Sequence, residues 1–354
     1  MRKMERRGLL LSILLATASL LFLVDGAASS QDLVWYRGNT HAHTNKSDGN
    51  VPPGVAAEWY LSRGYNFLCI TDHHILTPTS SVKLPSNPRK DFILIPGEEI
   101  TDRLHATAMN IQRTVSVQNG PTLSGTIQRY LEETERASGI LIVNHPNFDW
   151  RLGAKDIRPV AGVRLFELYN CHPLSNNEGD NSHVSTETMW DELLTDGMVI
   201  YGVASDDAHS YQIPYSPNLS SPGKGWVMVQ APKFTADAIC DSMRQGRFYA
   251  TNGVLLKSLK MSPSHIFVEI DKAATESELA FGSAFGRPAP EGSAVGERID
   301  FIGTGGKLLV SVAGLSASYT PIGNGYVRAR AVVTRVVNGM LTEYCAWTQP
   351  VFPH

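Results

Sequence analysis

The most constraining feature of the sequence is a regular alternation of short apolar runs and amphipathic stretches between residues 33 and 250. The amphipathic stretches carry helix signals: Pro53 opens Val55–Arg63 and Gly64 closes it, and Thr235 can cap Ala236–Gln245, with Gly246 after it. The apolar runs are aliphatic or β-branched and nearly continuous, which is typical of strands buried on both faces. They include Phe67–Thr71, Phe92–Pro96, Ile140–Asn144, Val163–Tyr169 and Met198–Ser205. We therefore predict an α/β fold, either a parallel barrel or a doubly wound sheet.

The pattern changes after Ala250. Residues 251–354 contain clusters of Gly and Pro and short runs of alternating polarity, and no convincing amphipathic helix is visible. Such runs between turn signals are typical of antiparallel sheets. We predict a small antiparallel β-sandwich-like domain at 251–354, packed on an α/β domain at 33–250. The chain is 42% hydrophobic and 18% charged, which supports a packed core and excludes wholesale disorder.

The first 28 residues have the layout of a signal peptide. An apolar run at Leu9–Val24 is followed by small residues at 26–28 and preceded by the basic residues Arg2, Lys3, Arg6 and Arg7. The run is shorter than the ~20 residues that a membrane span needs, so cleavage is favoured over retention as an anchor. We predict export to the periplasm or the cell exterior, with no stable membrane span after cleavage.

The net charge limits the classes of substrate that we expect, and the cysteine content bears on disulfides. The formal net charge of -3 gives no reason to expect a nucleic-acid polymer. A small phosphorylated substrate is compatible with this charge, because bound metal ions would bring positive charge of their own. Export would permit disulfides, but the four cysteines form no CxxC pair, and free buried thiols are the favoured interpretation. We expect a small-molecule substrate.

Residues of the kinds that bind metals follow five predicted strands, the first of which is expected at Leu33–Thr40. They are His41, His43, Asp48, Asp72, His73, His74, Glu98, Glu99, His105, His145, Asp206, Asp207 and His209. A lone His beside a strand is more often structural, and a lone Asp more often caps a turn. When such residues recur at successive strand ends, a structural role for each one is a poorer explanation. The carboxyl ends of parallel strands meet on one side of the fold, so these side chains are expected to lie together.

The spacing of these residues suits cations. In His41-Ala42-His43 both imidazoles lie on one face of an extended segment, and Asp207 and His209 repeat that spacing. Nitrogen and oxygen ligands without thiolates favour Mn, Zn or Fe. Paired cations lower the pKa of a bridging water, and no Ser-His-Asp or Gly-x-Ser-x-Gly pattern is visible. We therefore predict hydrolysis of an ester by a metal-bridging hydroxide.

Several of these segments, taken in order, carry a family resemblance. They are Gly38-Asn39-Thr40-His41-Ala42-His43, Ser47-Asp48-Gly49, Thr71-Asp72-His73, Pro96-Gly97-Glu98-Glu99-Ile100, Asn144-His145-Pro146 and Ser205-Asp206-Asp207-Ala208-His209. Together they closely resemble the polymerase and histidinol phosphatase (PHP) superfamily over about residues 36–250. The ending Tyr344–Pro350 and the exported context are similar to a narrower branch, the carbaryl-hydrolase-like metallohydrolases.

The resemblance implies a distorted (β/α)7, TIM-like barrel with a site for two or three divalent cations. By motif position, His41, His43, Glu99 and Asp207 would hold the first cation, Glu99, His105 and His145 the second, and Asp48, His73 and His209 the third. The family pattern selects Glu99 as the bridge and leaves Glu98 as the variable residue. The spacer between Glu99 and His105 is shorter than usual, which makes His105 the weakest of these assignments.

Other polar residues are candidates for supporting roles. Asp72 and Asp206 adjoin predicted ligands and are interpreted as carboxylates that orient them, with capping as the alternative. Asp72 also counts among the catalytic candidates, together with His172 and His183, which are placed to touch the substrate or to donate a proton to a leaving group. A surface-loop histidine is the alternative interpretation for His172.

Three functions follow from this set. The leading one is a phosphoesterase acting on a small mono- or diester, which the superfamily resemblance favours. The second is a carboxyl or carbamate ester hydrolase with the same metal site, which the narrower resemblance favours. The third is a non-catalytic carbohydrate- or surface-binding protein, suggested by the predicted β domain. The complete ligand set argues against the third function, because a barrel that had lost catalysis and only bound a ligand would not need every type of metal ligand.

Overall fold

The computed structural model describes residues 33–84, 90–212, 216, 218–281 and 286–353. The signal peptide predicted for residues 1–28 lies outside the described residues. Among the helices that are described, none is both long enough and apolar enough to cross a bilayer.

Strands and helices alternate in the first part of the chain, as the sequence predicts. The strands are β1 (Val34–Asn39), β2 (Phe67–Ile70), β3 (Ile93–Thr101), β4 (His105–Met109), β5 (Ile140–Val143), β6 (Leu165–Asn170), β7 (Tyr201–Ser205), β8 (Trp226–Ala231) and β9 (Phe248–Thr251). The helices are α1 (Pro53–Ser62), α2 (Leu123–Arg136), α3 (Ala154–Ile157), α4 (Thr186–Thr195) and α5 (Ala236–Arg244), with short 3-10 turns η1 (Thr79–Ser81) and η2 (Phe148–Trp150). The apolar runs thus become strands.

Helix ends follow from local hydrogen bonding. Thr122 caps α2 by accepting from the Gly125 N–H, and Thr235 caps α5 by accepting from the Ala238 N–H. Each side-chain oxygen satisfies a backbone donor that has no partner within the helix. α2 buries Thr126, Ile127, Tyr130, Leu131 and Thr134, and this apolar face packs against the sheet. Amphipathic spacing therefore placed these helices correctly.

These strands join five later ones, β12 (Arg287–Pro288), β13 (Gly296–Gly303), β14 (Lys307–Ala313), β16 (Val327–Val337) and β17 (Met340–Thr348), in one 14-stranded mixed sheet. Its order is β14-β13-β16-β17-β9-β8-β1-β2-β3-β4-β5-β6-β7, with β12 paired to β17. The pairs β1–β2, β2–β3, β5–β6 and β6–β7 are parallel, whereas β4 is antiparallel to both β3 and β5. After β1 and β7, a single parallel bridge joins Ala42 to Ala208. The fold is therefore mixed α/β, and the (β/α)7 barrel expected from the resemblance lacks a closing ladder among the described residues.

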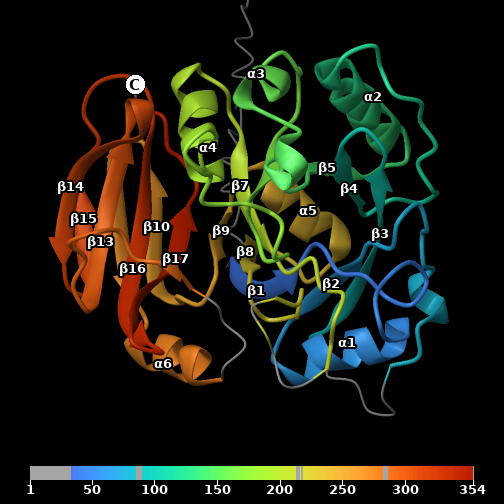
Figure 1. The fold of residues 1–354 in the computed structure, drawn as a ribbon, viewed down its shortest axis with the longest axis horizontal. Helices are drawn as coiled ribbons and strands as arrows, with labels where there is room; N and C mark the ends of the chain where they lie inside the picture. Colours follow the sequence, from blue (N-terminus) through green and yellow to red (C-terminus); the bar gives the residue numbers. More distant parts are fainter. Residues whose placement is uncertain (1–32, 85–89, 213–215, 217, 282–285, 354) are drawn as a thin grey trace, which may run out of the picture. The chain divides into compact units, whose positions relative to one another are not determined.

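The last part of the chain is mainly antiparallel. It contains β10 (Leu256–Ser262), β11 (His265–Ile270), β12 (Arg287–Pro288), β13 (Gly296–Gly303), β14 (Lys307–Ala313), β15 (Ser316–Tyr319), β16 (Val327–Val337) and β17 (Met340–Thr348), with the turn η3 (Thr304–Gly306). β10, β11 and β15 form a separate three-stranded sheet, and the others extend the large sheet (Figure 1). The domain boundary predicted at residue 250 falls inside β9.

One expectation for this region was wrong, because a helix, α6, spans Lys272–Ala280. Asp271 caps it by accepting from the Ala274 N–H, and only Thr275 is buried. A helix that buries one residue has no apolar stripe, so hydrophobic spacing could not reveal it.

The core joins the two parts of the chain. Trp347 of β17 stacks on Tyr169 of β6, with ring centroids 5.4 Å apart, and both belong to a cluster that also includes Trp190 of α4. The four cysteines are free, and Cys69, Cys240 and Cys345 are buried, so the expectation of free thiols holds.

Candidate metal centre

The carboxyl ends of β1, β2, β3, β5 and β7 bring most of the predicted ligands together. Three groups have ligand atoms that all lie within 4.8 Å of one another: His43, Asp48, His73 and His209; His41, Glu99 and His145; and His41, His43 and Asp207. The groups share His41 and His43, so they form one continuous cluster. Residues that are up to 168 positions apart in the chain thus converge because the strands that carry them are neighbours or meet at the Ala42–Ala208 bridge.

The most buried part of the cluster is formed by His41, His43 and Asp207. The Nε2 atoms of the two histidines are 3.1 Å apart, and the Asp207 Oδ1 atom lies 3.2 Å from one and 3.1 Å from the other. Asp207 has a φ of 49°, in the left-handed region that Asp tolerates better than most residues. Backbone strain of this kind occurs often at functional sites.

Glu99 lies between the groups, because its two oxygens face different histidines. Oε1 is 3.4 Å from His41 Nε2 and 3.2 Å from His145 Nε2, whereas Oε2 is 2.9 Å from His73 Nδ1 and 3.4 Å from His43 Nε2. Burial by itself would raise the pKa of Glu99, but His41, His105 and His145 hold that pKa well below its usual value. Glu99 is therefore a buried, ionised carboxylate.

The neighbouring residue Glu98 points elsewhere, since successive side chains of a strand alternate. It accepts a hydrogen bond from the Val115 N–H, and burial raises its pKa to about 7.

The outer part of the cluster is more accessible. Asp48 is half exposed, and its carboxylate lies 3.2 Å from His73 Nε2 and 3.3 Å from His209 Nε2. Burial favours the neutral form of Asp48, but hydrogen bonds with His209 and His73 outweigh it and lower the pKa. Burial likewise opposes the charge of His73, yet Asp48 and Glu99 raise its pKa to about 10. This part of the cluster is therefore accessible from solvent.

The donor set fits metal ions. His41 Nδ1 is 2.8 Å from the Glu167 carboxylate and so carries a proton, which leaves the Nε2 lone pair directed at Asp207 and Glu99. Burial opposes a charge on His41, but Asp207, Glu99 and Glu167 together raise its pKa well above the usual value. A lone pair and two carboxylates that converge in this way need a cation or an added proton between them. These groups could therefore bind metal ions, with nitrogen and oxygen ligands only.

Sequence reasoning missed Glu167, which holds two ligand-bearing segments in place. Its Oε1 contacts His41 Nδ1 and accepts from the Ser205 hydroxyl, and its Oε2 accepts from the His145 N–H and the Asn170 amide. A carboxylate behind a ligating histidine fixes its tautomer and ring orientation. The available signal was a charged residue in the middle of the apolar run at Val163–Tyr169.

His105 lies at the edge of the cluster and belongs to none of the three groups. Its Nδ1 is 3.4 Å from the Glu99 Oε1, and its Nε2 accepts a hydrogen bond of 3.3 Å from Arg151. This arrangement places His105 as a partner of the Glu99 carboxylate, and its role as a ligand stays a prediction.

Asp72 binds a loop that carries two of the predicted ligands. Asp72 accepts from the Thr44 N–H, the Thr44 hydroxyl and the Ser47 hydroxyl, in the loop between His43 and Asp48.

Asp206 accepts from the N–H groups of residues 223–225 and from the Tyr60 hydroxyl. Burial raises the pKa of Asp206 to about 6, although those hydrogen bonds oppose the shift. Asp206 therefore fixes the segment at residues 223–225 and Tyr60, none of which is a predicted ligand, and its role in orienting ligands stays a prediction.

The two remaining catalytic candidates lie in different places. The His172 ring is 5.6 Å from the His209 ring, between centroids, and its Nδ1 accepts from the Leu174 N–H. His183 lies outside the three groups and stacks on Trp150, with centroids 4.1 Å apart and planes 6° apart. Only His172 therefore faces a predicted ligand directly.

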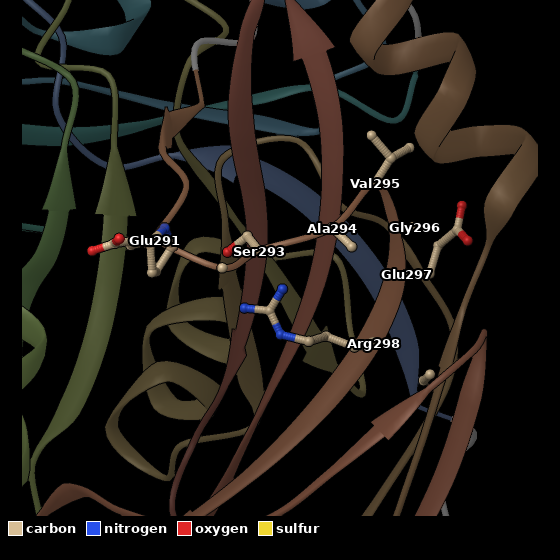
Figure 2. Close-up of a pocket in the computed structure, with 10 residues that line it drawn as sticks. Glu291, Ser293, Ala294, Val295, Gly296, Glu297 and Arg298 are labelled. Atoms are coloured by element: carbon tan, nitrogen blue, oxygen red, sulfur yellow. The ribbon is translucent and has the colours of Figure 1, made fainter.

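A separate cavity of about 400 Å³ lies beside β13, lined by Pro290–Arg298 and Ala313 (Figure 2). Its cation, Arg298, is engaged by Glu343 at 2.7 Å and by Asp300 at 3.3 Å. None of the three ligand groups contributes to it, so it offers no comparable chemistry.

Comparison with known proteins gives a distant likeness only. No protein-family model matches the chain, and no curated protein matches it. One similar structure is a two-domain protein from Bacteroides vulgatus ATCC 8482 containing a predicted PHP-like metal-dependent phosphoesterase, with 13% identity, a TM-score of 0.43 and coverage of 89% of this chain and 96% of that one. Another is a proposed metal-dependent phosphoesterase from Bifidobacterium adolescentis ATCC 15703, with 13% identity, a TM-score of 0.36 and coverage of 51% and 90%. Such low scores carry no argument about activity.

Proposed function

We propose that this protein is a metal-dependent phosphoesterase that acts on a small phosphate mono- or diester. The observation that carries the proposal is the continuous cluster of three ligand groups, in which buried Glu99 contacts histidines of each group. The order of the ligand motifs resembles the PHP superfamily and supports the choice of phosphate esters.

The chain's own residues define how such a site would work. His41, His43 and Asp207 would hold one cation, Glu99 and His145 a second, and Asp48, His73 and His209 a third. Bound divalent cations acidify water and offset the charge that develops on the ester oxygens. Glu167 keeps His41 in the tautomer that presents its Nε2 lone pair to the cluster.

His172 is the proposed hydrogen-bond donor to the leaving group. Because its Nδ1 accepts from the Leu174 N–H, the proton of the neutral ring resides on Nε2. The ring packs against Phe148 and His209, at the outer side of the cluster where a substrate enters. A neutral imidazole with its proton on Nε2 can donate a hydrogen bond to the oxygen of a leaving group.

We further propose that the protein is exported and acts on a small molecule, not on a nucleic-acid polymer. The basic segment and apolar run before residue 28 support export, and the net charge of -3 supports the choice of substrate size. Amino-terminal sequencing of exported protein should find a start near residues 28–31; an intact Met1 would contradict cleavage.

A second candidate is a carboxyl or carbamate ester hydrolase. It is favoured by the likeness of the ending Tyr344–Pro350 to the carbaryl-hydrolase-like branch. The ligand cluster suits both reactions, since each places negative charge on an ester oxygen.

The deciding experiment combines metal analysis of purified protein with a substrate panel. We expect at least two equivalents of Mn, Zn or Fe and turnover of nitrophenyl phosphates. Turnover of aryl carbamates without turnover of phosphates would reverse the order of the two candidates, and protein without bound or bindable metal would overturn both.

A further inference from the structure

A second cavity, of about 370 Å³, lies next to the metal centre and has a different character. Its lining combines the rings of Trp150 and His183, the cations Arg151 and Lys155, and apolar side chains such as Met189. Trp150 and His183 stack face to face, so the wall that they form is flat and aromatic. His183 is fixed by a 2.8 Å contact with Asp180.

One segment physically links the cavity to the centre. It begins at His145 and passes through Phe148, whose ring lies 5.2 Å from His145 and 5.9 Å from His172 between centroids. The segment ends at Arg151, which donates to His105 Nε2 and also lines the cavity. A group bound in the cavity would therefore lie beside Arg151, on the same side of the fold as His172, the proposed hydrogen-bond donor to the leaving group.

The backbone of this segment is held in an unusual conformation. Asp149 and Trp150 have consecutive positive φ angles of 52° and 56°, which are unfavourable for side chains other than Gly. The Asn147 amide donates to the backbone of Asn176 and Val184 and ties the segment to the loop that carries His183. Strain that tertiary contacts maintain in this way is characteristic of binding sites.

Charge distinguishes this cavity from a simple apolar hollow. Arg151 is paired with Asp149 at 2.9 Å, and the Asp156 carboxylate accepts from the Gly153 N–H. Within the described residues Lys155 forms no ion pair, so its ammonium group can pair with a bound anion, and Asp156 is the one carboxylate among the described lining residues. An aromatic wall beside a lysine that has no ion-pair partner suits a planar ring that bears a negative substituent.

We propose that this cavity binds the leaving group of the substrate, and that the substrate is the phosphate ester of an aromatic ring carrying an anionic group. The inference rests on the proposed phosphoesterase function. Trp150 would stack on the ring, Lys155 would pair with the anionic substituent, and Arg151 would face the ester linkage at the edge of the centre.

The test uses the full-length protein loaded with Mn²⁺ and three esters: glycerol phosphate, phenyl phosphate and 4-carboxyphenyl phosphate. Trp150→Leu should raise KM for both aryl esters roughly three- to tenfold, the usual worth of an aromatic contact, and leave kcat and glycerol phosphate unchanged. Trp59→Leu, on α1 and outside the cavity, is the matched control and should change neither. Lys155→Gln should raise KM for the carboxylated ester alone.

A binding measurement separates this inference from the function on which it rests. Wild-type protein should bind 4-hydroxybenzoate in equilibrium dialysis, and Trp150→Leu should weaken that binding by the same factor as KM. If no ester is hydrolysed but this difference in binding remains, the phosphoesterase proposal fails and the cavity assignment stands. If esters are hydrolysed with equal KM by wild type and Trp150→Leu, the cavity assignment fails. Should Trp150→Leu not fold, Trp150→Phe replaces it and should produce a smaller rise in KM for both aryl esters; an unchanged KM would overturn the assignment.

Discussion

Among the described residues, the metal centre and a second buried cluster of charged residues differ in how their charges are balanced. We call the second the arginine cluster. Its four guanidinium groups contact four carboxylates: Arg287, Arg298, Arg328 and Arg330, and Glu187, Asp191, Asp300 and Glu343. Arg328 contacts Asp191 at 2.7 Å and Glu187 at 2.9 Å, and Arg330 contacts Glu187 and Asp300 at 3.0 Å each. Every carboxylate therefore faces a permanent cation.

In the metal centre the carboxylates face imidazoles instead. A histidine supplies positive charge only when it is protonated, whereas a guanidinium is always charged. Burial would raise the pKa of Glu187, but Arg330, Arg328 and Arg287 lower it without any added ion. Glu99 relies on His41, His105 and His145 to lower its pKa in the same way. The arginine cluster can thus stabilise the fold alone, and the histidine cluster needs metal ions or protons.

The largest expected effect is the loss of function in Glu99→Gln. An amide keeps the shape of the side chain but removes the charge that both sides of the cluster share, so we expect background activity and the loss of more than one metal equivalent. Glu98→Gln is the matched control, since Glu98 faces Val115, and should have a modest effect. Metal stoichiometry and turnover of both variants show which glutamate is the bridge. An inactive Glu98→Gln beside an active Glu99→Gln would refute this assignment.

Asp191→Ala should be the strongest destabilising change in the arginine cluster. It leaves Arg328, which is 1% exposed, with one carboxylate partner fewer, and breaking a buried pair typically costs about 3–5 kcal/mol. Urea unfolding should show this loss equally in metal-loaded and chelator-treated protein. A loss that depends on metal would show that the two clusters are energetically coupled.

Glu167→Gln should weaken metal binding without abolishing it. Removing a carboxylate partner of a ligating histidine usually costs about 10- to 100-fold in metal affinity or activity. Here the His41 ring would lose the acceptor that fixes its tautomer. Competition with a chelating dye gives the affinity, and Glu187→Gln, in the arginine cluster, serves as the control. Unchanged affinity in Glu167→Gln would remove Glu167 from the centre.

The smallest expected effect is a pH dependence confined to metal-free protein. The pKa values of His41 and His73 are raised, that of His73 to about 10, so their stabilising effect is complete below the unfolded value near 6.5 and is lost as pH rises toward 10. Chelator-treated protein should therefore lose about 1–2 kcal/mol between pH 6.5 and 10, after allowance for solvent screening.

Metal-loaded protein should not lose stability in that range, because bound cations replace the protons. The arginine cluster contributes no slope there, since the pKa of Glu187 is lowered and its effect disappears only in acid. If the free energy of unfolding changes with pH in the same way with and without metal, His41 and His73 are not the groups that bind the metal.

Much of the α/β part was predictable from local pattern. Apolar runs became β2, β5, β6 and β7, and Thr235 caps α5 as its position indicated. The hairpin that makes β4 antiparallel was not foreseen, because the turn at residues 102–104 lacks the Gly and Pro signals that the prediction used. α6 was missed for the related reason that it buries almost nothing.

The sequence by itself determined which ligand types occur and at which strand ends, because alternation along a strand and the convergence of strand ends are local rules. Tertiary structure alone decided their partners. Glu167 meets His41 from 126 positions away, and Arg328 meets Asp191 from 137 positions away. The physical reason is that a buried charge takes its pKa and its role from whatever neighbour the fold brings within about 3 Å, and sequence spacing does not encode that neighbour.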